Sequence, residues 1–118
     1  MVYHWLYEEK KVKTISELYF VYYEKDIQFN ELPEQMSRKR FEDEWTFIAT
    51  VMAETLGHVY LRMQGEVWSP RGEARSLIRG VGADHTSMSI GDIIVHQSKA
   101  YGVDRRGFHE IELTQEAN

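Results

Sequence analysis

The sequence predicts an α+β fold, in which one antiparallel or mixed sheet of about five strands carries two or three helices on one face. The last third of the chain alternates short β-branched runs with turn residues, which is typical of a three-stranded meander. The middle of the chain joins an alternating apolar segment to an amphipathic helical pattern. The length of 118 residues allows a substantial core, so we expect a single domain over 1–118.

The N-terminal elements are defined by less regular patterns. Residues 2–8 alternate apolar side chains on both sides, which predicts a buried strand. Residues 14–25 open with the form of a capping box and continue with apolar residues at helical spacing, so we interpret them as a helix. The β-favouring residues within the same segment keep a strand open as the alternative. After a loop around Pro33, residues 36–43 predict a short helix.

The middle of the chain contains the clearest strand and helix patterns. Residues 45–51 alternate apolar and polar side chains and predict a strand. Residues 54–64 follow as an amphipathic helix, which Gly57 weakens by about 1 kcal/mol relative to alanine. Residues 66–82 show no periodicity beyond one helical turn at 73–78, so we expect a long loop there. Loops of this length in compact domains are often functional.

The meander follows from its turn residues. Gly91-Asp92 leads into the first strand, a polar connector at 97–99 joins it to the second, and a turn at 104–107 leads to the third. The three strands are expected at 93–95, 101–103 and 108–113. These turn lengths would place Ile94, Val103 and Phe108 in one cross-strand row, and His96, Tyr101 and Glu110 in the next.

Composition excludes several classes of protein. The chain has no cysteine, so disulfides, thiolate zinc sites and cysteine nucleophiles are absent. It has no apolar run of membrane-spanning length, and its start lacks the pattern of a signal peptide, so we expect a cytoplasmic protein without a membrane partner. The net charge is -5, and the one basic cluster, at 37–40, is followed directly by acidic residues. We therefore expect no nucleic-acid partner.

The stretch 85–113 contains a Ser/Thr-rich run that leads into Gly-Asp-Ile-Ile, then a Tyr, then Gly-Phe. The residues of this motif are Thr86, Ser87, Ser89, Ile90, Gly91, Asp92, Ile93, Ile94, Tyr101, Val103, Gly107 and Phe108. In these residues the stretch resembles the YodL-like domain and related small proteins of phages and mobile elements, which share a Ser/Thr-rich run with Gly or Ser before Asp-Val-Ile, then a Tyr, then Gly-Phe. Residues 47–64 and Trp68 also look like that set, so the resemblance covers about the last two-thirds of the chain. It implies a small protein in a host cytoplasm that binds and modulates a host or phage protein.

Two groups of residues are candidate binding sites. Arginine and aromatic residues dominate interface hot spots, which favours partner contact by four residues expected on loops: Trp68, Arg71, Arg105 and Arg106. The alternative is a small-ligand or nucleotide site in the Ser/Thr-rich turn together with the 66–82 loop. That turn contributes His85, Thr86, Ser87, Ser89 and Asp92. Turn hydroxyls more often satisfy their own backbone, so we favour a structural role for this group.

No pattern in the sequence favours catalysis or a bound cofactor. The histidines lack the spacing that brings three or four metal ligands together, and we expect ordinary surface histidines. The row of His96, Tyr101 and Glu110 could transfer protons, but without a nucleophile we expect a hydrogen-bonded surface cluster and no enzyme. An exposed edge strand, either 2–8 or 108–113, leaves a homodimer open.

Overall fold

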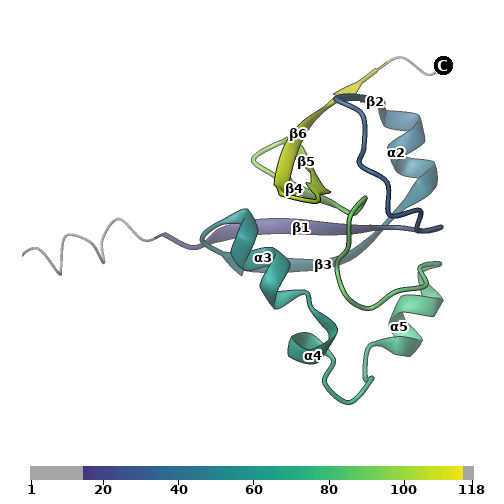
Figure 1. The fold of residues 1–118 in the computed structure, drawn as a ribbon, viewed down its shortest axis with the longest axis vertical. Helices are drawn as coiled ribbons and strands as arrows, with labels where there is room; N and C mark the ends of the chain where they lie inside the picture. The colour runs from purple at the N-terminus through teal and green to yellow at the C-terminus, as the bar shows by residue number, and fades with distance from the viewer. Residues whose placement is uncertain (1–14, 116–118) are drawn as a thin grey trace, which may run out of the picture.

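The computed structural model describes residues 15–115, so the strand predicted at 2–8 lies outside the described residues. Within 15–115 the chain forms one mixed sheet of six strands in the order β2-β6-β5-β4-β1-β3 (Figure 1). The β2–β6 pair is parallel, and every other neighbouring pair is antiparallel. The predicted α+β class and single sheet are confirmed.

β1 (Glu17–Glu24) is a strand between β3 and β4, so the helix predicted over 14–25 is wrong. Tyr19, Val21 and Tyr23 alternate onto one face of the sheet and are buried there. The helical spacing included Leu18, which lies on the opposite face and stays exposed. Backbone pairing on both sides of the segment outweighs the capping-box signal, because a central strand satisfies its N–H and C=O groups twice over.

β3 (Trp45–Ala53) confirms the strand predicted in the middle of the chain, but its alternation is interrupted. The register changes between Val21 and Tyr22, where Tyr22 faces Phe47 and Val21 faces Ala49. The extra residue, Ile48, forms a bulge. As a result, Phe47 lies on one face of the sheet, while Ala49, Val51 and Ala53 pack against the core on the other.

Helices cover both faces of the sheet, which corrects the expectation that they lie on one face (Figure 1). α3 (Leu56–Arg62), α4 (Gly65–Trp68) and α5 (Arg75–Gly80) contribute to the core on the Tyr19 face. α2 (Arg38–Glu44) packs Phe41 against the opposite face, beside β2 (Gln35–Ser37). No helix within the described residues is long and apolar enough to cross a membrane.

Side-chain caps explain where two predicted helices begin. The Ser37 hydroxyl accepts a hydrogen bond from the Arg40 N–H at 3.1 Å and starts α2. Thr55 does the same for the His58 N–H, also at 3.1 Å, at the start of α3. The segment predicted as a long loop at 66–82 instead contains most of α4 and all of α5, so the long loop is wrong, whereas the helical turn expected at 73–78 overlaps α5.

The meander is confirmed as β4 (Ile93–His96), β5 (Lys99–Asp104) and β6 (Gly107–Thr114). Its second turn has the predicted register, with Val103 opposite Phe108 and Tyr101 opposite Glu110. Its first turn contains only two residues, Gln97 and Ser98, at φ of 51° and 67°. Ile94 therefore faces Tyr101 rather than Val103, and the predicted first row is wrong by two residues.

Candidate functional site

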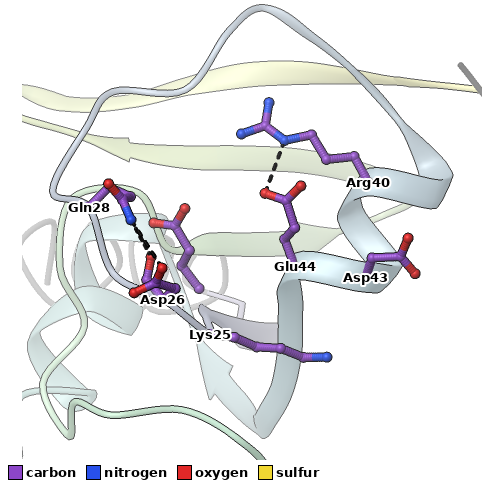
Figure 2. A pocket seen from close by; sticks show the side chains of 7 residues that line it. Lys25, Asp26, Gln28, Arg40, Asp43 and Glu44 are labelled. Carbon is purple, nitrogen blue, oxygen red and sulfur yellow. Dashed lines mark hydrogen bonds and ion pairs between the residues drawn. The ribbon is translucent and has the colours of Figure 1, made fainter.

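β1 ends beside a pocket of about 420 Å³ that lies between α2 and the segment after the strand (Figure 2). Its lining residues are Glu24, Lys25, Asp26, Gln28, Arg40, Asp43 and Glu44. The Arg40 Nε donates to Glu44 Oε1 at 3.2 Å, and its guanidinium lies 5.5 Å from the centre of the Trp45 ring. The pocket is therefore lined by charged and polar residues, and the Arg40 guanidinium within it is already paired with Glu44.

Glu24, the last residue of β1, is only 6% exposed. Within the described residues its Oε1 atom accepts no hydrogen bond. Burial raises the pKa of Glu24, and the backbone of Gln28 opposes that effect only in part. A Cβ placed on Gly91, whose φ is +98°, would lie 2.9 Å from this oxygen. The glycine is thus required both by the turn conformation and by the close approach of the carboxyl group.

Asp92 is completely buried, and its carboxylate is the centre of a polar network. Its Oδ1 accepts the Glu24 N–H at 2.8 Å, and its Oδ2 accepts the Ser89 N–H at 2.8 Å. The Nε2 atom of His85 lies 2.8 Å from the same Oδ2. One carboxylate therefore ties the end of β1 to the turn that precedes β4. We call Asp92, Glu24, His85 and Ser89 the Asp92 centre.

His85 lies between two carboxylates. Its Nδ1 is 3.0 Å from Asp84 Oδ1, while its Nε2 faces Asp92. Ionised carboxylates only accept hydrogen bonds, so this geometry fits an imidazolium with a proton on each ring nitrogen. Burial lowers the pKa of His85, and Asp92 together with Asp84 more than reverses that effect, so the net shift is upward. Burial raises the pKa of Asp92, and His85 offsets this in part.

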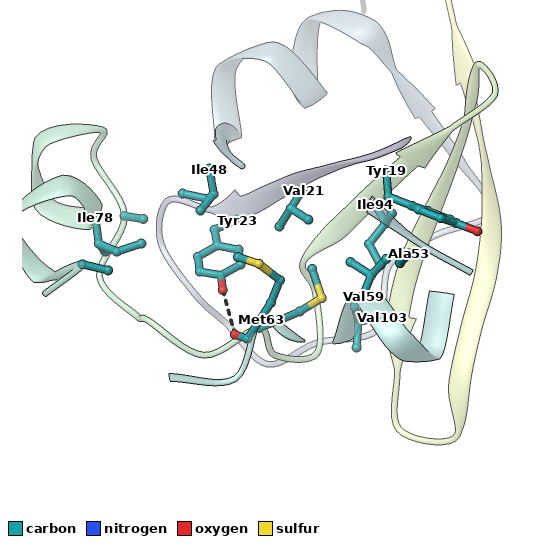
Figure 3. Packing of buried hydrophobic residues seen from close by; sticks show 13 residues of the cluster. Tyr19, Val21, Tyr23, Ile48, Ala53, Val59, Met63, Ile78, Ile94 and Val103 are labelled. Carbon is teal, nitrogen blue, oxygen red and sulfur yellow. Dashed lines mark hydrogen bonds between the residues drawn. The ribbon is translucent and has the colours of Figure 1, made fainter. Parts of the chain in front are cut away.

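Tyr23 joins the Asp92 centre to the hydrophobic core. Its ring stacks on His85 with centroids 4.5 Å apart, and its hydroxyl donates to the Thr86 carbonyl at 2.7 Å. The same hydroxyl lies 3.3 Å from the Met63 carbonyl (Figure 3). The Trp68 indole N–H also donates to the Thr86 carbonyl, at 3.0 Å. Burial raises the pKa of Tyr23, so the phenol remains a hydrogen-bond donor.

The hydroxyl groups of the predicted ligand turn also bond to the protein itself. Ser87 Oγ accepts the Gly65 N–H at 2.7 Å, and Ser89 Oγ donates to the Ser87 carbonyl at 3.1 Å. The structure therefore brings together all five residues of that candidate site, His85, Thr86, Ser87, Ser89 and Asp92. Their contacts support the structural interpretation, because they hold the turn against β1 and the start of α4.

The other two histidines of the C-terminal region are also paired with carboxylates. His96 lies opposite Lys99, so of its predicted row only the Tyr101–Glu110 pair forms. The His96 Nε2 atom lies 2.8 Å from Glu17 Oε1, and its ring stacks on Tyr19. His109 Nδ1 lies 2.8 Å from Asp104. The expectation of surface histidines is wrong for His85 and His96, whose side chains are 13% and 14% exposed. Within 15–115 no group of three or more potential ligands is arranged to hold a metal ion.

An exposed apolar surface lies on the other face of the same strand. Leu18 and Phe20 of β1 and Phe47 and Met52 of β3 are between 36% and 51% exposed. Leu18 is directly opposite Met52 in the register, and Phe47 is opposite Tyr22, the neighbour of Phe20 on this face. α2 covers the sheet only as far as Tyr22, whose ring is 4.9 Å from that of Phe41. We call Leu18, Phe20, Phe47 and Met52 the β1–β3 face.

β3 forms one end of the sheet built by residues 15–115, whereas β6, one predicted edge, lies between β5 and β2. The sequence of β3, WTFIATVMA, has no charged residue. The Arg62 guanidinium donates to the Met52 carbonyl, so the main-chain groups of Met52 point away from β1. Those of Thr50, two residues earlier, point the same way because the backbone of a strand alternates.

The residues predicted to bind a partner lie in different segments of the fold. Trp68 is half-buried in α4 against the core, so the expectation of an exposed loop tryptophan is wrong. Arg71 is exposed beyond α4, while Arg105 and Arg106 are exposed in the β5–β6 turn. Within 15–115 no hydrogen bond or ion pair joins the arginine pair to Trp68 or Arg71. The β1–β3 face was missed because the sequence was interpreted as a helix over 14–25.

No family model matches the chain, and no curated protein or solved structure is significantly similar to it. The resemblance to the YodL-like domain and phage proteins therefore remains a prediction from the sequence.

Proposed function

We propose that this protein is a non-enzymatic accessory protein of a phage or mobile element, which binds and modulates a host or phage protein. The observation that supports this function best is the β1–β3 face. Its four large apolar side chains are each at least one-third exposed and are contiguous across two strands. Soluble proteins seldom expose such patches beyond a few hundred Å² unless the patch binds something.

The distribution of polar groups also favours a binding protein. The residues with the chemistry of a reactive site, Asp92 and His85, are bonded to each other and to the backbone of β1 and the turn. Exposed apolar side chains supply most of the free energy of protein association, while a surrounding polar rim provides specificity. The β1–β3 face, together with neighbouring polar surface, could supply the roughly 800 Å² that each partner buries in a standard interface.

Affinity capture from host lysate, followed by mass spectrometry, tests the proposal. We expect the wild type to retain one specific protein and the double variant Phe20→Ser/Phe47→Ser to lose it. Arg105→Ala/Arg106→Ala is the matched control on the second candidate surface and should retain the protein. Loss of the captured protein with the arginine variant alone would show that the partner binds at the β5–β6 turn. Equal capture by both variants would refute both locations.

A further inference from the structure

We propose that the partner contributes an extended segment that pairs with the edge of β3, places apolar side chains against the β1–β3 face and carries basic residues at both ends. This inference rests on the proposed function and specifies the chemistry of the partner. Three independent features of β3 support it: its main-chain groups, its apolar side chains and the charges at its two ends.

The main-chain groups of β3 can accept another strand. Thr50 directs its N–H and C=O away from β1 and is exposed. On the next outward-facing residue, Met52, the carbonyl is already bonded to Arg62. Natural proteins protect long edge strands with charges, prolines or covering segments. The sequence of β3 contains neither a charged residue nor a proline. Such an edge is a template for strand addition.

The side chains beside this edge select for an apolar segment. Phe47 and Met52 lie on β3 itself, and both are about half exposed. A strand added to β3 would place every second side chain about 5 Å from those of β3 on this face. Apolar residues at these positions would bury Phe47 and Met52, and the intervening residues would face the side of α3.

Charge distinguishes a basic partner from a second copy of this chain. The uncharged strand begins directly after Glu44 and ends directly before Glu54, and both glutamates are exposed. Arg40 and His58 contact these glutamates, but exposed pairs of this kind contribute little free energy, so an incoming cation can compete with them. Pairing two copies of β3 in either direction would bring glutamates together at both ends of the strand. Lys or Arg at the ends of the incoming segment would instead complement them.

Selection from a displayed library of random ten-residue peptides on the full-length protein tests this inference. We expect the enriched peptides to alternate apolar residues and to carry Lys or Arg at both ends. Fluorescence anisotropy then measures their Kd. Thr50→Pro should weaken binding at least tenfold, because proline removes the outward N–H and leaves the β1–β3 hydrogen bonds in place. Thr50→Ala is the matched control and should change Kd less than threefold.

Each other outcome overturns the inference in a distinguishable way. Peptides that lose affinity with Phe20→Ser but not with Thr50→Pro would show that the face binds without strand addition, which leaves the proposed function intact. No enrichment, or acidic peptides insensitive to both variants, would reject the β1–β3 face altogether. Sedimentation showing a dimer that Thr50→Pro dissociates would assign the edge to a second copy. Trp5 is one of the apolar residues of the strand predicted at 2–8. Tighter peptide binding by Trp5→Asp would assign the β3 edge to that segment of this chain.

Discussion

The two ends of β1 serve different purposes. At its C-terminal end, Glu24 belongs to the Asp92 centre and Tyr23 stacks on His85 of that centre, where nearly every polar group has a partner within the protein. At its N-terminal end, Leu18 and Phe20 present large apolar side chains to the surface. The most reactive residue types of this protein therefore hold the fold together, while ordinary apolar residues form the exposed surface that we propose for a partner.

The largest expected effect is that of removing the carboxylate from the Asp92 centre. Asp92→Ala leaves the Glu24 and Ser89 N–H groups and the His85 ring without their acceptor. We expect it to lower the free energy of unfolding by about 3–5 kcal/mol, as is typical when one partner of a buried charged pair is removed. Urea denaturation measures the change. Asp92→Asn, which keeps one acceptor oxygen, should lose less. A loss below about 1 kcal/mol for the alanine variant would refute a central structural role.

A smaller effect is expected from the Tyr23 hydroxyl. Tyr23→Phe removes its hydrogen bond to the Thr86 carbonyl, but the Trp68 indole still donates to that oxygen. The free energy of unfolding should therefore fall by about 1 kcal/mol, the usual net value of one hydrogen bond. Tyr22→Phe, on the opposite face of β1, is the control and should change it by less. Equal losses of unfolding free energy in the two variants would show that the hydrogen bond from Tyr23 to the Thr86 carbonyl does not stabilise the turn.

The pH dependence of stability provides a third test of the Asp92 centre. The folded-state pKa of His85 is raised, so its stabilising contribution is complete below the ordinary histidine pKa and is lost as pH rises through the folded value. The wild type should therefore exceed His85→Phe in stability by more at pH 5.5 than at pH 9. Unfolding by urea at both pH values measures this difference. A difference that grows toward alkaline pH would contradict the imidazolium between Asp84 and Asp92.

The smallest stability effect is expected on the β1–β3 face. Phe20→Ser and Phe47→Ser should each lower the free energy of unfolding by about 1 kcal/mol or less, because these rings already contact water. Partner capture should nevertheless be lost. Denaturation and capture measured on the same variants separate the two effects. A large loss of stability without loss of capture would show that Phe20 and Phe47 belong to the core and do not bind the partner.

Local signals in the sequence predicted the meander well. Gly91-Asp92 marks a real turn, and the backbone at Gly91 has the positive φ that glycine tolerates. The first hairpin was misplaced because Gln97 and Ser98 adopt positive φ without the Asn-Gly or Asp-Gly pair that normally announces a two-residue turn. The register error followed directly from the turn length.

Features that depend on distant partners could not be predicted. β1 looked helical because the spacing of Ile15, Leu18 and Tyr22 is compatible with a helix, and only its pairing with β3 and β4 makes it a strand. Asp92 was correctly placed in a turn, but its main-chain partner Glu24 lies 68 residues earlier in the chain. The β1–β3 face likewise combines two segments, so neither one alone indicates an exposed patch.

We propose that a partner binds at the β1–β3 face and the β3 edge, whereas the contacts of the Asp92 centre stabilise the fold. Amide hydrogen exchange at Thr50, with and without a saturating peptide from the displayed library, tests it most directly. We predict at least tenfold slower exchange at Thr50 on binding, with little change at Glu24 and Ser89, whose N–H groups are already bonded to Asp92. Unchanged exchange at Thr50, with slowing at Arg105 and Arg106 instead, would contradict the account.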